Sequence, residues 1–341
     1  METEEKAQGS VKPYPAGTYN LLTTNKPIDP DILDLEYILG FRLRSGWVDL
    51  QPAMGDFNFT YIDEQVASAK AKGRFLGLGI SAGVTAPPEL WSKKGVTKFT
   101  LSPDDITIEK SPPDMGLPWE PAFQSYWFKV IGALGKRYDG ERTVSYVVVS
   151  GFMQLMENRF VLTAEDEARV QTLAKAAGFA DFAAAYTDGA QKIIARYMQA
   201  FPRTPVILTT TARVITSDPT IGKNLVAWAK AQYPKRFGTM SAGLMATQPP
   251  HDPNTNAPLT YPQGDQPIFS SDDQERFYKD PVPVPFPNAP QPVDDLLAAA
   301  VTKNDMWVEL YTLDCKNITN REVIVARNLE LIAVANKAQG F

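Results

Sequence analysis

The segment from Arg42 to Gly73, RLRSGWVDLQPAMGDFNFTYIDEQVASAKAKG, changes from a strand pattern to a helix pattern. It begins with alternating apolar and charged residues, which is typical of a β-strand. Pro52 and Gly55 then interrupt the pattern in a polar loop. Thr60, with Asp63 three residues later, resembles a capping box that begins an amphipathic helix, and Gly73 ends it. Strand, loop and helix in this order predict a βα unit of a parallel sheet.

Short apolar runs alternate with helical patterns along the rest of the chain. We expect strands near 18–23, 36–43, 75–81, 144–150, 205–210, 237–242, 266–270 and 305–311. We expect further helices around the apolar stripes at 123–134 and 182–197, and near 221–232, 293–303 and 320–338. This alternation predicts an α/β fold, a (β/α)8 TIM barrel, whose long proline-rich loops (83–121, 246–265 and 278–292) lie at the C-terminal face of the strands. We expect one barrel domain over residues 1–341, with 1–15 as a flexible N-terminal segment.

Composition excludes several classes of function. The net charge of −5 and the pI of about 5.2 argue against a nucleic-acid partner, and no apolar stretch is long enough to span a membrane. The lone Cys315 excludes an intramolecular disulfide and a cysteine metal cluster, and the lone His251 argues against a multi-histidine site. The polar N-terminus lacks the apolar core of a signal peptide, so a cytoplasmic protein and a secreted protein without its leader both stay open. The oligomeric state also stays open.

Two segments carry a resemblance to a known group of enzymes. FRLRSGWVDLQPAMGDFNFTYIDEQVASAKAKG (41–73) and GKRYDGERTVSYVVVSG (135–151) resemble the second-strand loop and the approach to the fourth strand of clan A (β/α)8 glycoside hydrolases, notably family 42 β-galactosidases and family 5 relatives. The resemblance implies hydrolysis of a β-linked sugar by two carboxylates, through a retaining mechanism that needs neither cofactor nor metal. Those enzymes carry Asn-Glu at the end of the fourth strand. Here that strand is followed by SGFMQLMEN, and the first carboxylate is Glu157.

Glu157 and Glu309 are the predicted catalytic pair. Glycoside hydrolysis needs one carboxyl group that protonates the leaving oxygen and another that attacks the sugar or activates water. Glu157 lies among apolar residues, which would raise its pKa and suit a general acid, although a solvent-facing loop position is the alternative. Glu309 shares a strand face with Trp307 and Tyr311, so we expect it inside the barrel as nucleophile or sugar ligand. The alternative is a structural glutamate bonded to Arg42 or Arg44.

An acidic run after the expected seventh strand offers a rival for the nucleophile, within residues 272–275. Arg44 at the end of the second strand can orient a carboxylate or bind a sugar hydroxyl. Aromatic side chains at strand ends can stack on the apolar faces of sugars. The predicted substrate-binding residues are Arg44, Trp47, Trp91, Trp119, Trp307, Tyr311, Asp272 and Gln274. A barrel that binds a glycan or a protein without catalysis is the main competing interpretation of the whole chain. A barrel enzyme of different chemistry, such as a lyase with Tyr311 or Glu309 as base, is a third.

Overall fold

Eight parallel strands form a closed barrel in the computed structural model. The structure describes residues 10–102, 114–155, 158–159, 162–209, 220–244, 263–267 and 292–340. The order of the strands around the barrel is β1-β12-β11-β10-β9-β6-β3-β2. Their bounds are Gly17–Leu21 (β1), Gly40–Gly46 (β2), Phe75–Ser81 (β3), Val144–Val148 (β6), Val206–Thr209 (β9), Phe237–Leu244 (β10), Gln263–Pro267 (β11) and Trp307–Leu310 (β12). The predicted barrel is therefore confirmed, and each predicted strand overlaps an observed one.

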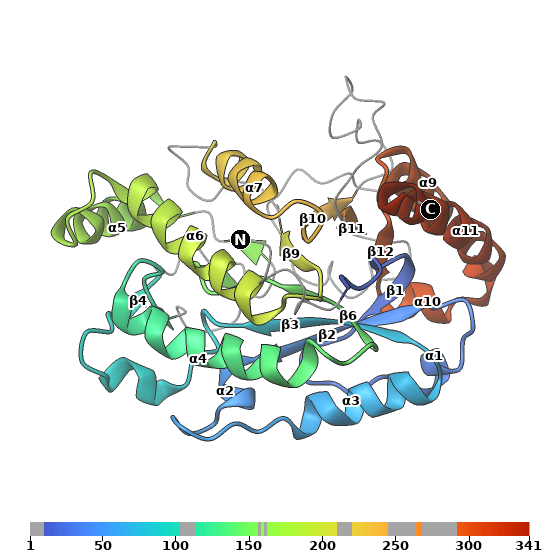
Figure 1. Cartoon of the computed structure of the whole chain (residues 1–341), viewed down its shortest axis with the longest axis horizontal. Coiled ribbons are helices and arrows are strands. Elements are labelled where there is room, and N and C mark those ends of the chain that lie inside the picture. Colours follow the sequence, from blue (N-terminus) through green and yellow to red (C-terminus); the bar gives the residue numbers. More distant parts are fainter. Residues whose placement is uncertain are drawn as a thin grey trace.

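Helices surround these strands, with α3 and α4 below, α6 and α7 above and α9 and α11 to the right in Figure 1. The longer helices are Thr60–Ala71 (α3), Pro121–Tyr138 (α4), Ala164–Ala176 (α5), Phe182–Ala200 (α6), Ile221–Gln232 (α7), Val293–Thr302 (α9) and Arg321–Gln339 (α11). The short ones are Pro30–Leu33 (α1), Trp47–Leu50 (α2), Thr312–Lys316 (α10) and the 3-10 turns Pro88–Ser92 (η2) and Ile318–Asn320 (η4). Two small antiparallel pairs, β4 (Phe99–Thr100) with β5 (Asp114–Met115) and β7 (Gln154–Leu155) with β8 (Asn158–Arg159), lie in the connections.

The start of α3 differs from the predicted capping box. The helix begins at Thr60, and the N–H of Thr60 donates to Oδ1 of Asn58 at 3.0 Å. The carboxylate of Asp63 does not close the box; it accepts from Nε of Arg137 at 2.8 Å and from the hydroxyl of Tyr138 at 2.9 Å. The capping-box prediction was wrong because Asp63 faces α4 and joins the two helices. The helix ends before Gly73, whose φ of +64° suits a glycine.

Alternation along the strands divides the barrel into two interiors. The helix-side core lies between strands and helices and includes Phe41, Leu43 and Val308. The lumen, inside the barrel, holds a separate cluster. Its barrel members are Tyr19, Tyr146, Val148, Ile207, Met240 and Trp307. The strands are therefore covered on both faces, as expected for a parallel barrel.

Residues 10–15 pack across the N-terminal end of the barrel. The N–H of Lys12 donates to the carbonyl of Arg203 at 2.8 Å, and its ammonium donates to the carbonyls of Glu141 and Val144 at 2.7 and 2.8 Å. Tyr14 is buried beside them. This part of the expected flexible segment is thus held by hydrogen bonds, while residues 1–9 lie outside the described residues.

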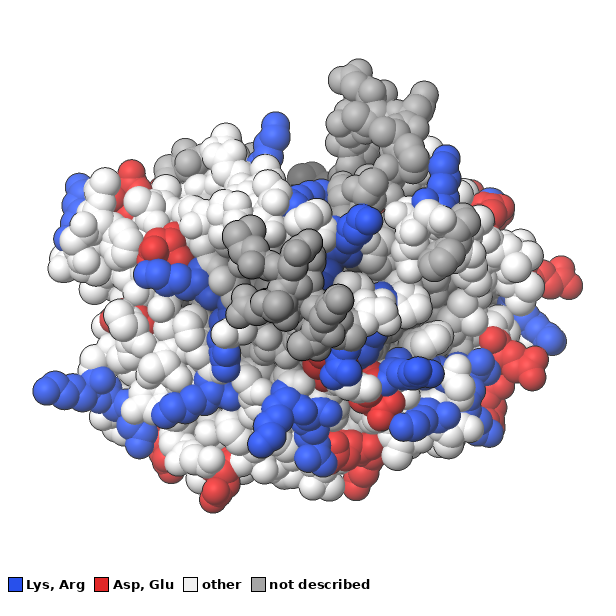
Figure 2. Space-filling model, viewed as in Figure 1, with Lys and Arg blue, Asp and Glu red and all other residues white. Residues whose placement is uncertain are grey.

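Figure 2 shows acidic and basic side chains interspersed over the face that it presents. Within the described ranges, no helix is both long enough and apolar enough to cross a membrane.

Candidate functional site

The lumen of the barrel contains large polar side chains because β3 presents glycines to it. A Cβ atom added at Gly77 would overlap the ring of Tyr146, and one added at Gly79 would overlap the guanidinium of Arg42. The alternating glycines of FLGLGIS therefore leave room for the side chains of neighbouring strands.

Glu309 lies in this lumen, as predicted. Its side chain is 0% exposed, and its Oε1 accepts a hydrogen bond from the hydroxyl of Tyr146. Trp307, two residues earlier on β12, packs its ring 5.3 Å from that of Tyr146. Val308 and Leu310 belong to the helix-side core, which confirms the predicted division of this strand. A carboxylate, a phenol and an indole are therefore neighbours inside the barrel.

Arg42 places a positive charge beside the same tyrosine. Its side chain is 1% exposed, and its guanidinium carbon lies 5.9 Å from the centre of the Tyr146 ring. Tyr146 thus contacts the cation through its ring and Glu309 through its hydroxyl. Burial raises the pKa of Tyr146 well above its usual value, the negative charge of Glu309 raises this pKa further, and Arg42 opposes both effects. The phenol consequently stays protonated and donates to the carboxylate.

Tyr19 extends this arrangement toward the N-terminal end of the barrel. Its ring lies 5.7 Å from that of Tyr146, and its hydroxyl is 3.1 Å from Oγ of Ser145. Burial raises the pKa of Tyr19, the bond with Ser145 lowers it, and the charge of Glu309 raises it. Tyr19 is register partner to Glu309 on the adjacent strand. Two protonated phenols therefore lie on this side of the carboxylate, and that of Tyr146 donates to it.

The C-terminal end of the lumen is lined by hydroxyl groups and a second arginine. Arg44 is half-buried there, with Arg42 one layer below it. A small cavity of about 20 Å³ lies between them and the ends of β2, β3 and β6. Such a volume accommodates about one water molecule. Its hydroxyl-bearing lining residues are Thr24, Ser45, Ser81, Thr85 and Ser150. Arg44 therefore stands at the barrel mouth, where the sequence predicted it.

Two predicted sugar-binding tryptophans lie in the helix-side core. Trp47 is fully buried, with its ring 5.0 Å from that of Trp127, and its Nε1 donates to Oε1 of Gln51 at 2.9 Å. Trp119 is also buried and packs its ring 5.7 Å from that of Phe182 on α6. Both indoles are enclosed by protein on the outer side of the strands. Neither ring faces the lumen. The prediction that Trp47 and Trp119 contact a sugar was therefore wrong, and both residues pack in the helix-side core.

The other predicted residues fall into three places. Trp307 is in the lumen, and no hydrogen-bond acceptor for its Nε1 exists among the residues that the structure describes. Tyr311 is half-buried directly after β12, and Trp91 is half-buried in η2 against the helix-side core. The remaining predicted site residues lie outside the described ranges. They are Glu157, Asp272 and Gln274.

Sequence reasoning did not identify Tyr146 as a site residue. The signal was present, because a tyrosine inside the apolar strand VSYVVV must place its hydroxyl against a partner. That partner, Glu309, is 163 residues away in the sequence. Within the described part of the chain, no group of three or more His, Cys, Asp or Glu side chains could hold a metal ion.

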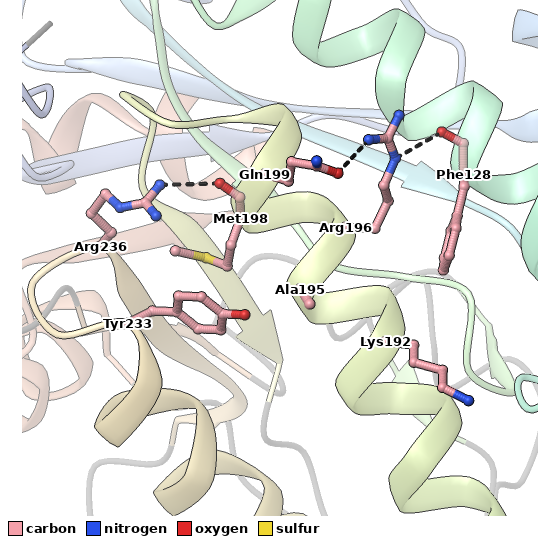
Figure 3. Close-up of a pocket in the computed structure, with 8 residues that line it drawn as sticks. All are labelled: Phe128, Lys192, Ala195, Arg196, Met198, Gln199, Tyr233 and Arg236. Carbon is pink, nitrogen blue, oxygen red and sulfur yellow. Dashed lines mark hydrogen bonds between the residues drawn. The ribbon is translucent and has the colours of Figure 1, made fainter. Parts of the chain in front are cut away.

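A groove of about 690 Å³ on the outer surface is a second concave feature (Figure 3). Arg196 crosses it from α6 and donates to the carbonyl of Phe128 on α4 at 3.2 Å. Arg236 donates to the carbonyls of Met198 and Phe201, where α6 ends, at 3.2 and 3.1 Å. These guanidinium groups are used to join helices. We therefore interpret the groove as structural.

Comparison with known proteins gives a match in structure alone. No protein-family model matches the sequence, and no curated protein matches it. The catalytic domain of the β-amylase from Paenibacillus polymyxa matches with a TM-score of 0.58 and 8% identity, over 94% of this chain and 100% of that domain. The β-galactosidase from Rahnella sp. R3 matches with a TM-score of 0.57 and 12% identity, over 96% of this chain and 58% of the other.

The β-galactosidase from the psychrophilic Marinomonas ef1 matches with a TM-score of 0.55 and 9% identity, over 95% of this chain and 62% of the other. This chain therefore spans about three fifths of the length of these β-galactosidases. The matches show that the chain shares the (β/α)8 fold of these enzymes, among them β-galactosidases of the kind that the sequence resembles. At these identities the likeness concerns the fold.

Proposed function

We propose that the protein is a glycoside hydrolase that cleaves a β-linked sugar by a two-carboxylate, retaining mechanism. The observation that carries the proposal is Glu309, a glutamate inside the barrel that accepts a hydrogen bond from Tyr146. A buried carboxylate costs free energy unless it is compensated or used. The structural matches to β-galactosidases and a β-amylase supply the fold in which such chemistry is known.

Glu309 acts as the nucleophile in this proposal. The Tyr146 hydroxyl favours the ionised form of the carboxylate by donating to it, and it fixes the orientation of the reacting oxygen. Glu157 is the proposed acid and base, which protonates the leaving oxygen and then deprotonates water. A retaining pair requires carboxyl groups about 5–5.5 Å apart. An acid of the 272–275 segment remains the alternative nucleophile.

The sugar subsite combines charge with aromatic surface. Arg44 at the barrel mouth can donate to sugar hydroxyls, and the Nε1 of Trp307 is a buried donor for which the described residues provide no acceptor. Tyr311, directly after β12, supplies an aromatic ring at the same end. Trp91, Asp272 and Gln274 complete the proposed set. Trp47 and Trp119 are left out because the helix-side core encloses them.

A panel of nitrophenyl β-glycosides tests the activity. We expect Glu309→Gln to lower kcat/KM by at least about 10³-fold, since nucleophile and neighbouring donor act as a unit. Glu322→Gln, at an exposed position of α11, is the matched control and should keep the wild-type value within about twofold. A fluorinated mechanism-based glycoside should label the peptide that contains Glu309, as read by mass spectrometry. Hydrolysis that survives in Glu309→Gln would refute this assignment.

A second candidate is a barrel that binds a glycan without turning it over. One observation favours it: Glu309 is fully enclosed and its partner Tyr146 is itself buried, as in a structural network. This candidate predicts saturable binding of an oligosaccharide by calorimetry without product by chromatography. Release of reducing sugar by the wild type, abolished in Glu309→Gln, would eliminate it.

A further inference from the structure

The N-terminal end of the barrel contains a pocket of about 740 Å³, at the opposite end from the lumen mouth. Residues 10–14 and Ala16 form one wall. Leu39 before β2, Phe75 at the start of β3 and residues of the 139–142 segment before β6 form another. The C-terminal half of α11 closes the third side. This volume is within the range of sites that bind small organic molecules, about 300–1,000 Å³.

Apolar side chains dominate the interior of this pocket. Val11 is 41% exposed and Phe75 is 46% exposed, although both are large apolar residues. Leu39 and Ile332 lie with them in the lining. Exposed apolar surface gathered in a concave site is typical of a ligand-binding surface. The floor is formed by Tyr19, so the pocket is separated from Glu309 by the lumen tyrosines.

One positive charge in the lining is available to a ligand. Arg203 forms an ion pair with Asp139, in which Nε and Oδ2 are 2.8 Å apart. The ammonium of Lys12 donates to backbone carbonyls. Arg142 is exposed and forms no ion pair with any residue in the described ranges. A guanidinium without an anion at an apolar pocket is a recognition group for a carboxylate or a sulfonate.

We propose that this pocket binds an amphiphilic organic anion. Its apolar body, of one or two rings or a medium-length alkyl chain, packs between Val11, Phe75 and Ile332. Its single acidic group pairs with Arg142. We expect a free molecule and not a membrane surface, because the site is concave and the guanidinium of Arg142 lines its cavity. This proposal does not depend on the proposed hydrolase activity, since Glu309 does not line the pocket.

Fluorescence titration with anilinonaphthalene sulfonate, and displacement of this probe by dodecanoate, tests the proposal. The wild-type chain should bind the probe saturably at one site. Phe75→Ser and Arg142→Gln should each weaken dodecanoate binding by about tenfold or more, as expected for losing an apolar anchor or a charged hydrogen bond. Dodecanol, which lacks the charge, should bind weakly to both the wild type and Arg142→Gln.

Matched controls exist on the outer side of α11. Leu329→Ser removes another exposed apolar side chain and Arg321→Gln another exposed arginine, both outside the pocket lining. Both should leave the dissociation constants within about twofold. Should Phe75→Ser fail to fold, as judged by circular dichroism, Val11→Ser replaces it. The proposal is overturned by non-saturable binding, by equal weakening in the controls, by wild-type affinity in Arg142→Gln, or by co-sedimentation with anionic vesicles in place of single-site binding.

Discussion

The lumen and the helix-side core of this barrel are both buried, but they are built in different ways. In the helix-side core, Trp47 and Trp127 pack among aliphatic and aromatic side chains, and their indole N–H groups bond to Gln51 and to the carbonyl of Ser150. In the lumen, Arg42 and Glu309 bring formal charges next to Tyr146. The stability of the helix-side core depends on the shape and volume of its side chains. The stability of the lumen depends on a polar network in a low-dielectric space.

This difference predicts different responses to mutation. Side chains in an apolar core contribute through buried area and the cavity that their loss leaves. The contributions of buried polar groups to stability depend on one another, because removing one group leaves its partners without compensating charge or hydrogen bonds. Losses in the helix-side core should therefore add between distant positions, while losses in the lumen should be coupled.

The largest expected effect belongs to the helix-side core. Trp47→Ala should lower the free energy of unfolding by about 4 kcal/mol, since it removes a fully buried indole between the barrel and α4. Urea denaturation followed by circular dichroism measures this. Trp91→Ala, at a half-buried position in η2, is the control and should cost less than half as much. A loss below about 1 kcal/mol for Trp47→Ala would contradict the assignment of this residue to packing.

A double-mutant cycle distinguishes the two regions most directly. Arg42→Met should cost about 3 kcal/mol, because it removes the cation beside Tyr146 and leaves Glu309 ionised in the lumen. In Arg42→Met with Glu309→Gln, the combined loss should be smaller than the sum of the single losses by about 1–2 kcal/mol. Arg42→Met with Leu331→Ala, on α11, should be additive within about 0.5 kcal/mol. Additivity in both cycles would show that the lumen charges act separately.

The smallest expected effect is a change at alkaline pH. The folded-state pKa of Tyr146 is raised, so the neutral phenol stabilises the fold fully below the unfolded value of about 10, and this contribution is lost as pH rises above it. Tyr146→Phe should therefore reduce the loss of stability between pH 10 and 11 by about 1 kcal/mol, because the unfolded phenol is only half ionised at pH 10. Ile207→Val, a neighbour in the lumen without a titrating group, should keep the wild-type slope. An unchanged slope in Tyr146→Phe would mean that the phenol ionises freely in the folded state.

Much of the fold could be predicted because its signals are local. The alternation in FRLR predicted that Arg42 faces away from Phe41 and Leu43, and the alternation in WVEL predicted the same separation of Glu309 from Val308. These patterns extend over four residues, and strand geometry alone converts them into faces. The predicted capping box failed for the opposite reason, since the partner of Asp63 is on another helix.

The site was less predictable, and the tryptophans show why. Trp47 stands at a strand end in the sequence, which indicated a substrate-facing position. In the structure β2 ends at Gly46 and α2 begins at Trp47, so the chain has already turned and its indole enters the helix-side core. The conformation of this turn, and not the order of residues, decides whether such a side chain faces the lumen or the helix-side core.

The sequence by itself determined the eight βα units, the strand faces and the presence of two arginines and a glutamate on the inner one, because periodicity is a property of neighbouring residues. Only the tertiary structure decided that Tyr146 bonds to Glu309 and that Gly77 and Gly79 make room for this network. It also decided that Val11 and Phe75 line one pocket at the N-terminal end of the barrel. Those contacts join strands and segments that are distant along the chain. They come into existence when the barrel closes, and closure is a property of all eight strands together.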